Sequence, residues 1–138
     1  RQRQMCIRDR IITPHEGEAA RLLKANKISS QKNRQIMVKK LFNLYPGTVV
    51  LIGKETIVYD GGSFSICPAG NPGMAVGGMG DVLSGMISGY LAQGLSSKEA
   101  SILGVFHHAV ACDSLQENYG QRSLRPSILL DHLVDLEL

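Results

Sequence analysis

The sequence predicts an α/β domain in which helices cover a sheet, and three observations indicate this class. Residues 48–52 form an unbroken run of strand-forming, mostly β-branched residues, typical of a strand buried on both faces. Helix-start signals occur at Thr13 and Ser96. The predicted elements follow the order helix, strand, short hairpin and helices, which favours a layered arrangement. The predicted strands are few for a complete domain, so we expect the chain to be part of one.

Residues 11–47 are predicted to hold a short strand and two helices. Residues 11–12 would end the strand. Thr13, Pro14 and Glu16 would begin the first helix, with Thr13 as the N-cap, Pro14 in the first helical position and Glu16 completing a capping box. A second helix would run over residues 30–45, where the Pro-Gly pair that follows stops it.

Residues 48–138 are predicted to hold the remaining strands and helices. The strands would cover residues 48–52, 56–59 and 64–67, and the helices would cover residues 82–91, 96–116 and 126–136. Ser96 and Glu99 would form a capping box. Gly85, Gly89 and Ala92 would share one helix face that packs closely against a neighbouring helix.

A glycine-rich loop precedes Asp81 and is the most informative feature of the chain. Glycines at positions 70, 73, 77, 78 and 80 let the backbone approach another group without a Cβ in the way. Because a helix follows, the loop would present free backbone N–H groups at a helix N-terminus, which is an anion site. Asp81 is then either an acid that favours the helix dipole or a catalytic base beside a phosphate. Capping does not need the glycines, which favours the base.

Composition and charge exclude several classes of protein. The chain has 138 residues, 43% of them hydrophobic and 20% charged, which is typical of one soluble globular domain. The net charge is only +3 and there is no Trp, so nucleic-acid binding has little support. Asp81 and several glycines interrupt the apolar stretch 74–93, which argues against a membrane helix.

The cysteines and the paired histidines are predicted to be structural. Cys6, Cys67 and Cys112 form neither a CxxC pair nor a disulfide framework, which fits a reducing, cytoplasmic location. His107-His108 has no carboxylate or Cys at ligand spacing, so no protein metal site is expected there.

Two segments carry a resemblance to a known family. Residues 13–18, Thr-Pro-His-Glu-Gly-Glu, and residues 69–85, which hold Asn-Pro-Gly-Met-Ala-Val-Gly-Gly-Met-Gly-Asp-Val-Leu, resemble the ADP/ATP-dependent NAD(P)H-hydrate dehydratases of the ribokinase-like superfamily. The resemblance implies a ribokinase-like layered α/β/α fold, of which residues 11–138 would be the C-terminal half. Residues 1–10 would be an unrelated or disordered N-terminal extension.

The resemblance also implies a reaction, a hydro-lyase step that repairs hydrated NADH or NADPH. ADP or ATP, with ADP favoured, would phosphorylate the ring hydroxyl, and phosphate would then be eliminated. Asp81 would be the catalytic base and contact the substrate, as would His15. The implied nucleotide-binding residues are Ile52, Gly53, Lys54, Glu55, Thr56 and Gly80, and the implied anion-hole loop is Gly77, Gly78, Met79 and Gly80. Mg²⁺ is expected as the counter-charge for the phosphoryl groups.

Two positions depart from the pattern of the family. Ile52 stands where the family usually has Lys, so a cationic contact would be missing or supplied by Lys54. Glu16 stands where the family usually has Pro, which the helix start tolerates.

Two other functions remain open. One is a ribokinase-like kinase of a vitamin precursor. The other is an inert fragment that keeps only a nucleotide-binding loop, in which strand 48–52 loses its partners and leaves a long apolar edge. A homo-oligomer is also left open.

Overall fold

The computed structural model describes residues 10–24, 31–120, 122 and 124–135, so the predicted extension 1–10 lies outside the described residues except for Arg10. The elements are, in order, β1 (Ile11–Ile12), α2 (Glu16–Leu23), α3 (Gln31–Leu44), β2 (Thr48–Leu51), β3 (Ile57–Tyr59), β4 (Phe64–Ile66), the 3-10 helix η1 (Pro72–Met74), α4 (Met79–Ala92), α5 (Ser97–Tyr119) and α6 (Pro126–Asp135). The types and positions of the predicted elements are confirmed, with ends that differ by a few residues.

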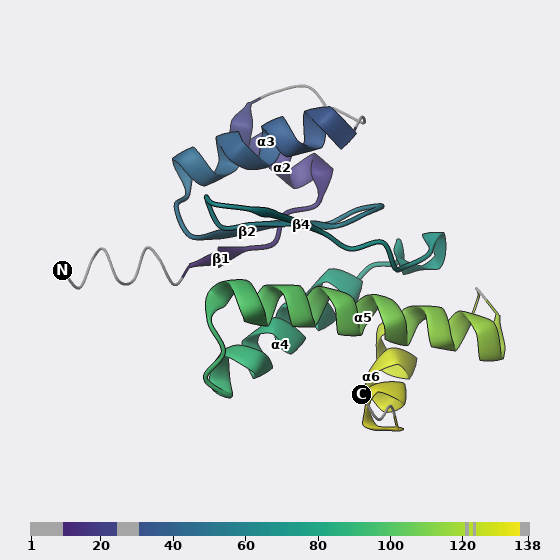
Figure 1. The fold of residues 1–138 in the computed structure, drawn as a ribbon. Helices are drawn as coiled ribbons and strands as arrows, with labels where there is room; N and C mark the ends of the chain where they lie inside the picture. The colour runs from purple at the N-terminus through teal and green to yellow at the C-terminus, as the bar shows by residue number, and fades with distance from the viewer. Residues whose placement is uncertain (1–9, 25–30, 121, 123, 136–138) are drawn as a thin grey trace.

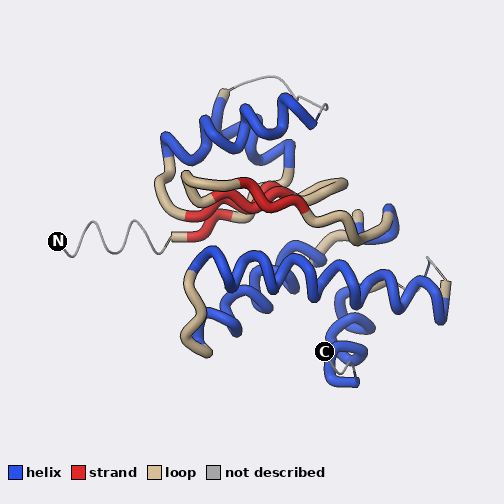
Figure 2. Tube along the Cα trace, viewed as in Figure 1, coloured by secondary structure: helices blue, strands red, loops and turns tan. Residues whose placement is uncertain are grey.

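The described elements form three layers. The sheet has the order β1-β2-β3-β4, with β1 parallel to β2 and the other neighbours antiparallel. Helices α2 and α3 lie on one face of this sheet and α4 and α5 on the other, with α6 beyond them (Figure 1), so that the strands are enclosed between helical layers (Figure 2). The predicted α/β/α layering is therefore confirmed.

Strand β2 is the centre of this arrangement because it contributes to both cores. Val49 and Leu51 pack with buried residues of α2 and α3, whereas Val50 packs with buried residues of α4 and α5. Successive side chains of a strand point to opposite faces, so a fully apolar strand serves two helical layers. The prediction of a strand buried on both faces is confirmed.

The prediction that residues 48–52 leave a long apolar edge is wrong. Within the described sheet, β2 pairs with β1 through Thr48 and Ile11 and with β3 through Val49 and Tyr59. The chain crosses back through α2 and α3 and places β2 beside the strand it left. The outer strand on that side is β1, which has only 2 residues.

The predicted start of the first helix is also wrong, by two residues. Helix α2 has His15 as its N-cap, and the capping box joins His15 to Glu18 rather than Thr13 to Glu16. The reason lies in the sheet, since the Pro14 carbonyl accepts a hydrogen bond from the Ile52 N–H at 2.9 Å. This contact keeps Thr13 and Pro14 extended beside β2, and the helix begins only after them.

Helices α4 and α5 do not pack through the predicted glycine face. Gly85, Gly89 and Ala92 are exposed, and a Cβ added at either glycine would meet nothing within 4 Å. The close approach occurs at Gly104 of α5, where an added Cβ would lie 2.6 Å from Ile87 Cγ1. The pairing of the two helices depends on which faces the sheet leaves available, and local spacing does not show this.

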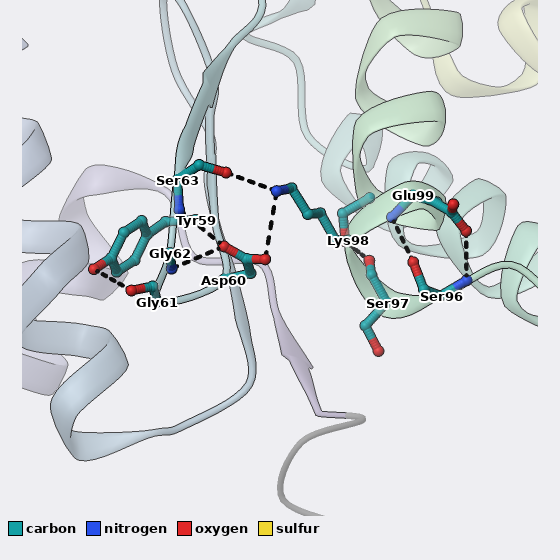
Figure 3. A network of polar contacts seen from close by, with 10 residues as sticks. Tyr59, Asp60, Gly61, Gly62, Ser63, Ser96, Ser97, Lys98 and Glu99 are labelled. Atoms are coloured by element: carbon teal, nitrogen blue, oxygen red, sulfur yellow. Dashed lines mark hydrogen bonds and ion pairs between the residues drawn. The ribbon is translucent and has the colours of Figure 1, made fainter.

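The capping box of Ser96 and Glu99 at the start of α5 is confirmed. Between these two residues, Lys98 places its Nζ 2.6 Å from Ser63 Oγ and 3.5 Å from Asp60 Oδ2 (Figure 3). Asp60 in turn accepts hydrogen bonds from the N–H groups of Gly62 and Ser63. This network fastens the β3–β4 turn to the start of α5, remote from the glycine loop. None of the helices in the described part of the chain is long and apolar enough to cross a membrane.

Candidate functional site

A single cleft of about 1500 Å³ brings together every residue that the sequence predicted for the site. The cleft lies between the ends of β1 and β2, the loop that follows β4, and the start of α4. Its lining includes His15, the turn Ile52, Gly53, Lys54, Glu55 and Thr56, and the loop Gly77, Gly78, Met79, Gly80 and Asp81. Segments that are far apart in the chain therefore meet in one place, although their roles stay predictions.

One wall of the cleft is the start of α2, where the segment 13–15 runs beside Ile52. His15 and Ile52 form an isolated parallel bridge, and Thr13 Oγ1 lies 3.2 Å from Ser84 Oγ of α4. The imidazole of His15 is held by its own helix, because its Nδ1 accepts a hydrogen bond from the Glu18 N–H at 3.2 Å. The cap therefore fixes the ring at the mouth of the cleft and leaves Nε2, 3.5 Å from Glu18 Oε1, as its outer nitrogen.

The turn at the end of β2 forms the adjoining part of the wall. The Thr56 hydroxyl donates to the Gly53 carbonyl at 3.1 Å, and the Gly53 N–H donates back to Thr56 Oγ1 at 3.4 Å. Lys54 and Glu55 are exposed at the tip, where Glu55 has a φ of 57°. Lys54 lines the cleft and carries the positive charge of this turn, since Ile52 has none.

The N-terminus of α4 also lines the cleft. Its N-cap is Gly78, with a φ of 91°, and no side chain caps the helix. A Cβ at Gly78 would lie 3.0 Å from Pro126 Cγ, whereas one at Gly77 would meet nothing within 4 Å. Glycine at 78 is therefore required by both backbone conformation and space. The first N–H groups of an α-helix have no partner within the helix, although that of Met79 donates to the Val76 carbonyl at 3.2 Å. Gly78 and Gly80 line the cleft at this helix end, where an anion site can form.

Asp81 lies in the first turn of α4, exposed and in the lining of the cleft. Because Gly78 is the N-cap, Asp81 is not the cap residue itself. Asp81 therefore places a carboxylate in the first turn of the helix that follows the glycine loop, and both line the same cleft.

Asp113 of α5 is a site-forming residue that sequence reasoning missed. Its Oδ2 accepts from the Gly70 N–H at 3.0 Å and its Oδ1 accepts from Asn71 Nδ2 at 2.7 Å. Asn71 Oδ1 in turn accepts from the Gly73 N–H at 3.0 Å and caps η1. These hydrogen bonds anchor the part of the cleft lining at Gly70 and Asn71 to α5. The signal available in the sequence was an acid within the mostly apolar stretch 109–115.

His108 also borders the cleft, from beneath the start of α4. It is 4% exposed, and burial lowers its pKa to about 4. The charge of His107 also lowers this pKa, whereas a hydrogen bond with the Met79 backbone raises it. His107 Nδ1 lies 2.8 Å from the Tyr90 hydroxyl. Within the described residues no group of three or more His, Cys, Asp or Glu side chains is placed to hold a metal ion.

The two described cysteines are buried free thiols. Burial raises the pKa of Cys112 to about 12, and burial also raises that of Cys67, with Asp113 adding to both shifts. Both therefore stay protonated at neutral pH, as core residues do.

Comparisons with known proteins agree on one family. The profile of the NAD(P)H-hydrate dehydratase family matches residues 2–134. The bifunctional NAD(P)H-hydrate repair enzyme of Vibrio cholerae is 47% identical over 127 residues, which cover 92% of this chain and 26% of the relative. The ADP-dependent (S)-NAD(P)H-hydrate dehydratase of Neisseria meningitidis is 40% identical over 111 residues, which cover 80% of this chain and 38% of the relative.

Solved structures give the same result for the fold. The ADP/ATP-dependent NAD(P)H-hydrate dehydratase of Bacillus subtilis, co-crystallized with ATP/Mg²⁺, matches with a TM-score of 0.82 and 30% identity, and the match covers 91% of this chain and 46% of that one. Phosphofructokinase-2 of Escherichia coli matches with a TM-score of 0.58 at 16% identity, which shows the fold alone. The chain thus spans about a quarter of the length of the first curated relatives and about half of that solved relative.

Proposed function

Because this chain belongs to the NAD(P)H-hydrate dehydratase family, we propose that it carries the phosphoryl-transfer centre of an enzyme that dehydrates hydrated NADH and NADPH at the expense of an adenine nucleotide. The observation that supports this proposal most strongly is the single cleft that holds His15, the turn 52–56 and the loop 77–81 together. A kinase-like site requires the same juxtaposition of a nucleotide wall, an anion site and a base.

The proposed reaction has two steps. The carboxylate of Asp81 takes the proton of the ring hydroxyl, and the hydroxyl oxygen attacks the terminal phosphorus of the nucleotide, whose bond to the leaving phosphate oxygen breaks. The ring C–O bond then breaks, phosphate leaves with the electron pair, and loss of a proton from the adjacent ring carbon restores the double bond. The backbone N–H groups at Gly78 and Gly80 stabilise the charge that develops on the transferring group, whereas the Met79 N–H already donates to the Val76 carbonyl.

The remaining residues of the cleft are assigned to binding. His15 contacts the hydrated ring, and the turn Ile52, Gly53, Lys54, Glu55 and Thr56 contacts the adenine nucleotide together with Gly80. Lys54 supplies the positive charge on this turn, since Ile52 cannot. Both assignments are supported by the lining of the cleft and by the exposure of Lys54.

The proposal includes ADP as the preferred nucleotide and Mg²⁺ as its counter-ion. The Neisseria relative is named as ADP-dependent, and the Bacillus structure was co-crystallized with ATP/Mg²⁺. Mg²⁺ is commonly held by substrate phosphates with one or two carboxylates, and Asp81 is the carboxylate nearest in sequence to the anion loop. When bound, the ion would neutralise phosphate charge. A cytoplasmic location is also proposed, because Cys67 and Cys112 are free thiols.

The test is recovery of the reduced ring. Hydrated NADH is incubated with ADP or ATP and Mg²⁺, and the absorbance of the reduced nicotinamide is followed over time. One arm contains the 138-residue chain alone, and a second adds the segment that precedes the matching region in the Vibrio cholerae relative.

The proposal is supported if the absorbance of the reduced nicotinamide recovers in either arm, if this recovery requires nucleotide, and if Asp81→Asn abolishes it. Phosphorylation of a vitamin alcohol without recovery would establish the kinase instead. If both arms neither bind nucleotide nor restore the ring, the chain is inert and the proposal fails. A strong preference for ATP at equal concentrations would reverse the choice of ADP alone.

A further inference from the structure

The geometry behind the turn 52–56 points to Arg34 as a positioning residue for nucleotide binding, acting together with Glu16. This inference rests on the proposed function, because it assigns a purpose to a buried charge that touches neither nucleotide nor substrate. Arg34 lies on α3, is 3% exposed and is absent from the lining of the cleft. It therefore acts only through the backbone that it holds.

The guanidinium of Arg34 binds the turn from beneath. Nη1 donates to the carbonyls of Lys54 and Glu55, the latter at 3.0 Å, and Nη2 donates to the Leu51 carbonyl at 3.3 Å. Three carbonyls at the end of β2 and in the turn thus converge on one side chain. A planar fork with five donors can satisfy several acceptors in fixed directions, which an ammonium group cannot do.

The same side chain joins the turn to the other binding segment. Arg34 Nε lies 2.9 Å from Glu16 Oε1, and Glu16 is the first residue of α2, directly after His15. An ion pair between the buried Arg34 and the partly exposed Glu16 therefore connects the backbone of the proposed nucleotide turn to the helix that presents the proposed substrate contact. Burial lowers the pKa of Arg34, while the charges of Glu16 and Glu55 oppose that shift.

Gly53 shows how closely the turn is seated on this support. A Cβ added at Gly53 would lie 2.8 Å from Arg34 Nη2. The backbone at Gly53 therefore packs directly against the guanidinium, so the position of the turn relative to the cleft depends on Arg34. Backbone hydrogen bonds hold the ends of the turn, from the Ile52 N–H to the Pro14 carbonyl and from the Cys67 N–H to the Thr56 carbonyl. Between these ends, Lys54 and Glu55 are exposed, and Arg34 is the side chain that binds their carbonyls.

A positioning role of Arg34 and a merely structural role would change the kinetic constants differently. Loss of the Arg34 guanidinium would let the turn 52–56 move and would weaken nucleotide binding. Asp81 and the glycine loop, which Arg34 does not hold, would keep their places. Nucleotide Kd and KM would rise and kcat would change little. General destabilisation would instead lower the amount of active protein, and so the apparent kcat, with KM unchanged.

The experiment compares Arg34→Lys and Glu16→Gln with two matched exposed controls, Arg122→Lys and Glu117→Gln. ADP binding is measured by titration calorimetry, turnover in the assay above gives KM and kcat, and hydrogen exchange is followed on peptides covering residues 52–57 and 79–92. For Arg34→Lys we expect a Kd for ADP about tenfold higher, the order expected for one lost hydrogen bond to a charged group. Exchange should accelerate in residues 52–57 and not in α4.

Glu16→Gln keeps Arg34 in place and should shift Kd in the same direction by a smaller factor. If Arg34→Lys folds poorly, Glu16→Gln alone decides. Equal Kd values in wild type and both variants would overturn the inference while leaving the proposed function intact. A wild-type chain that binds no ADP in either arm would overturn the proposed function, and the inference with it, before any variant is compared.

Discussion

His108 should make folding stability depend on pH in a way that the structure allows to be calculated. Its pKa is about 4 in the folded chain and 6.5 in the unfolded chain. Between these values the unfolded chain binds more protons, so stability is complete above pH 6.5 and is lost as pH falls toward 4. From the linkage relation, moving from pH 7 to pH 5 should cost about 2 kcal/mol.

The perturbation is His108→Gln, which removes the titrating group and keeps a polar side chain of similar size. The unfolding free energy is measured by urea denaturation, followed by circular dichroism, at several pH values between 5 and 8. The loss of stability over this range should be smaller in the variant than in wild type by about 2 kcal/mol, the contribution of His108, whatever the variant's stability at pH 7. His132→Gln, at a half-buried position of α6 whose Nε2 lies 3.1 Å from Ser114 Oγ, is the control for loss of a histidine and should change the pH slope less than His108→Gln does. Identical pH slopes for wild type and His108→Gln would refute the reasoning.

Three further predictions concern single side chains. Gly104→Ala should destabilise the chain by about 1 kcal/mol, because overpacking against Ile87 exceeds the gain in helix propensity. Gly85→Ala, where an added Cβ meets nothing, should stabilise it by a similar amount. Melting temperatures that shift in the same direction in both variants would contradict this. Asp81→Asn should lower turnover by several orders of magnitude with little change in ADP affinity, and activity retained within about tenfold would assign Asp81 to the helix dipole alone. Asp113→Ala should accelerate hydrogen exchange in residues 68–76 and cost about 1–3 kcal/mol of stability, and an unchanged exchange rate would show that the loop holds itself.

Much of the candidate site was predictable because its parts are encoded locally. The φ of 91° at Gly78 and the uncapped helix after it follow from a run of glycines before an apolar helix. The capping box of Ser96 and Glu99 requires only four consecutive residues. The resemblance of residues 13–18 and 69–85 to one family then indicated that the two segments serve one site.

Other features escaped prediction because they depend on partners distant in the chain. The helix start moved from Thr13 to His15 because Ile52 holds Pro14 in an extended conformation. Glu16, predicted as a cap, instead pairs with Arg34. Neither change can be read from the segment itself, since the competing hydrogen bond and the buried cation come from other elements.

The sequence by itself therefore determined the layers, the glycine loop and the place of Asp81 in the first turn of the helix after it. All of these arise from backbone conformation and apolar patterning over a few neighbouring residues. Only the tertiary structure decided which side chains hold these parts against one another. Asp113 meets Asn71 from 42 residues away, Arg34 meets the Glu55 carbonyl from 21 and Thr13 meets Ser84 from 71. These contacts join different parts of the layered structure, and burial between the layers strengthens their hydrogen bonds. Local spacing in the sequence therefore does not reveal them.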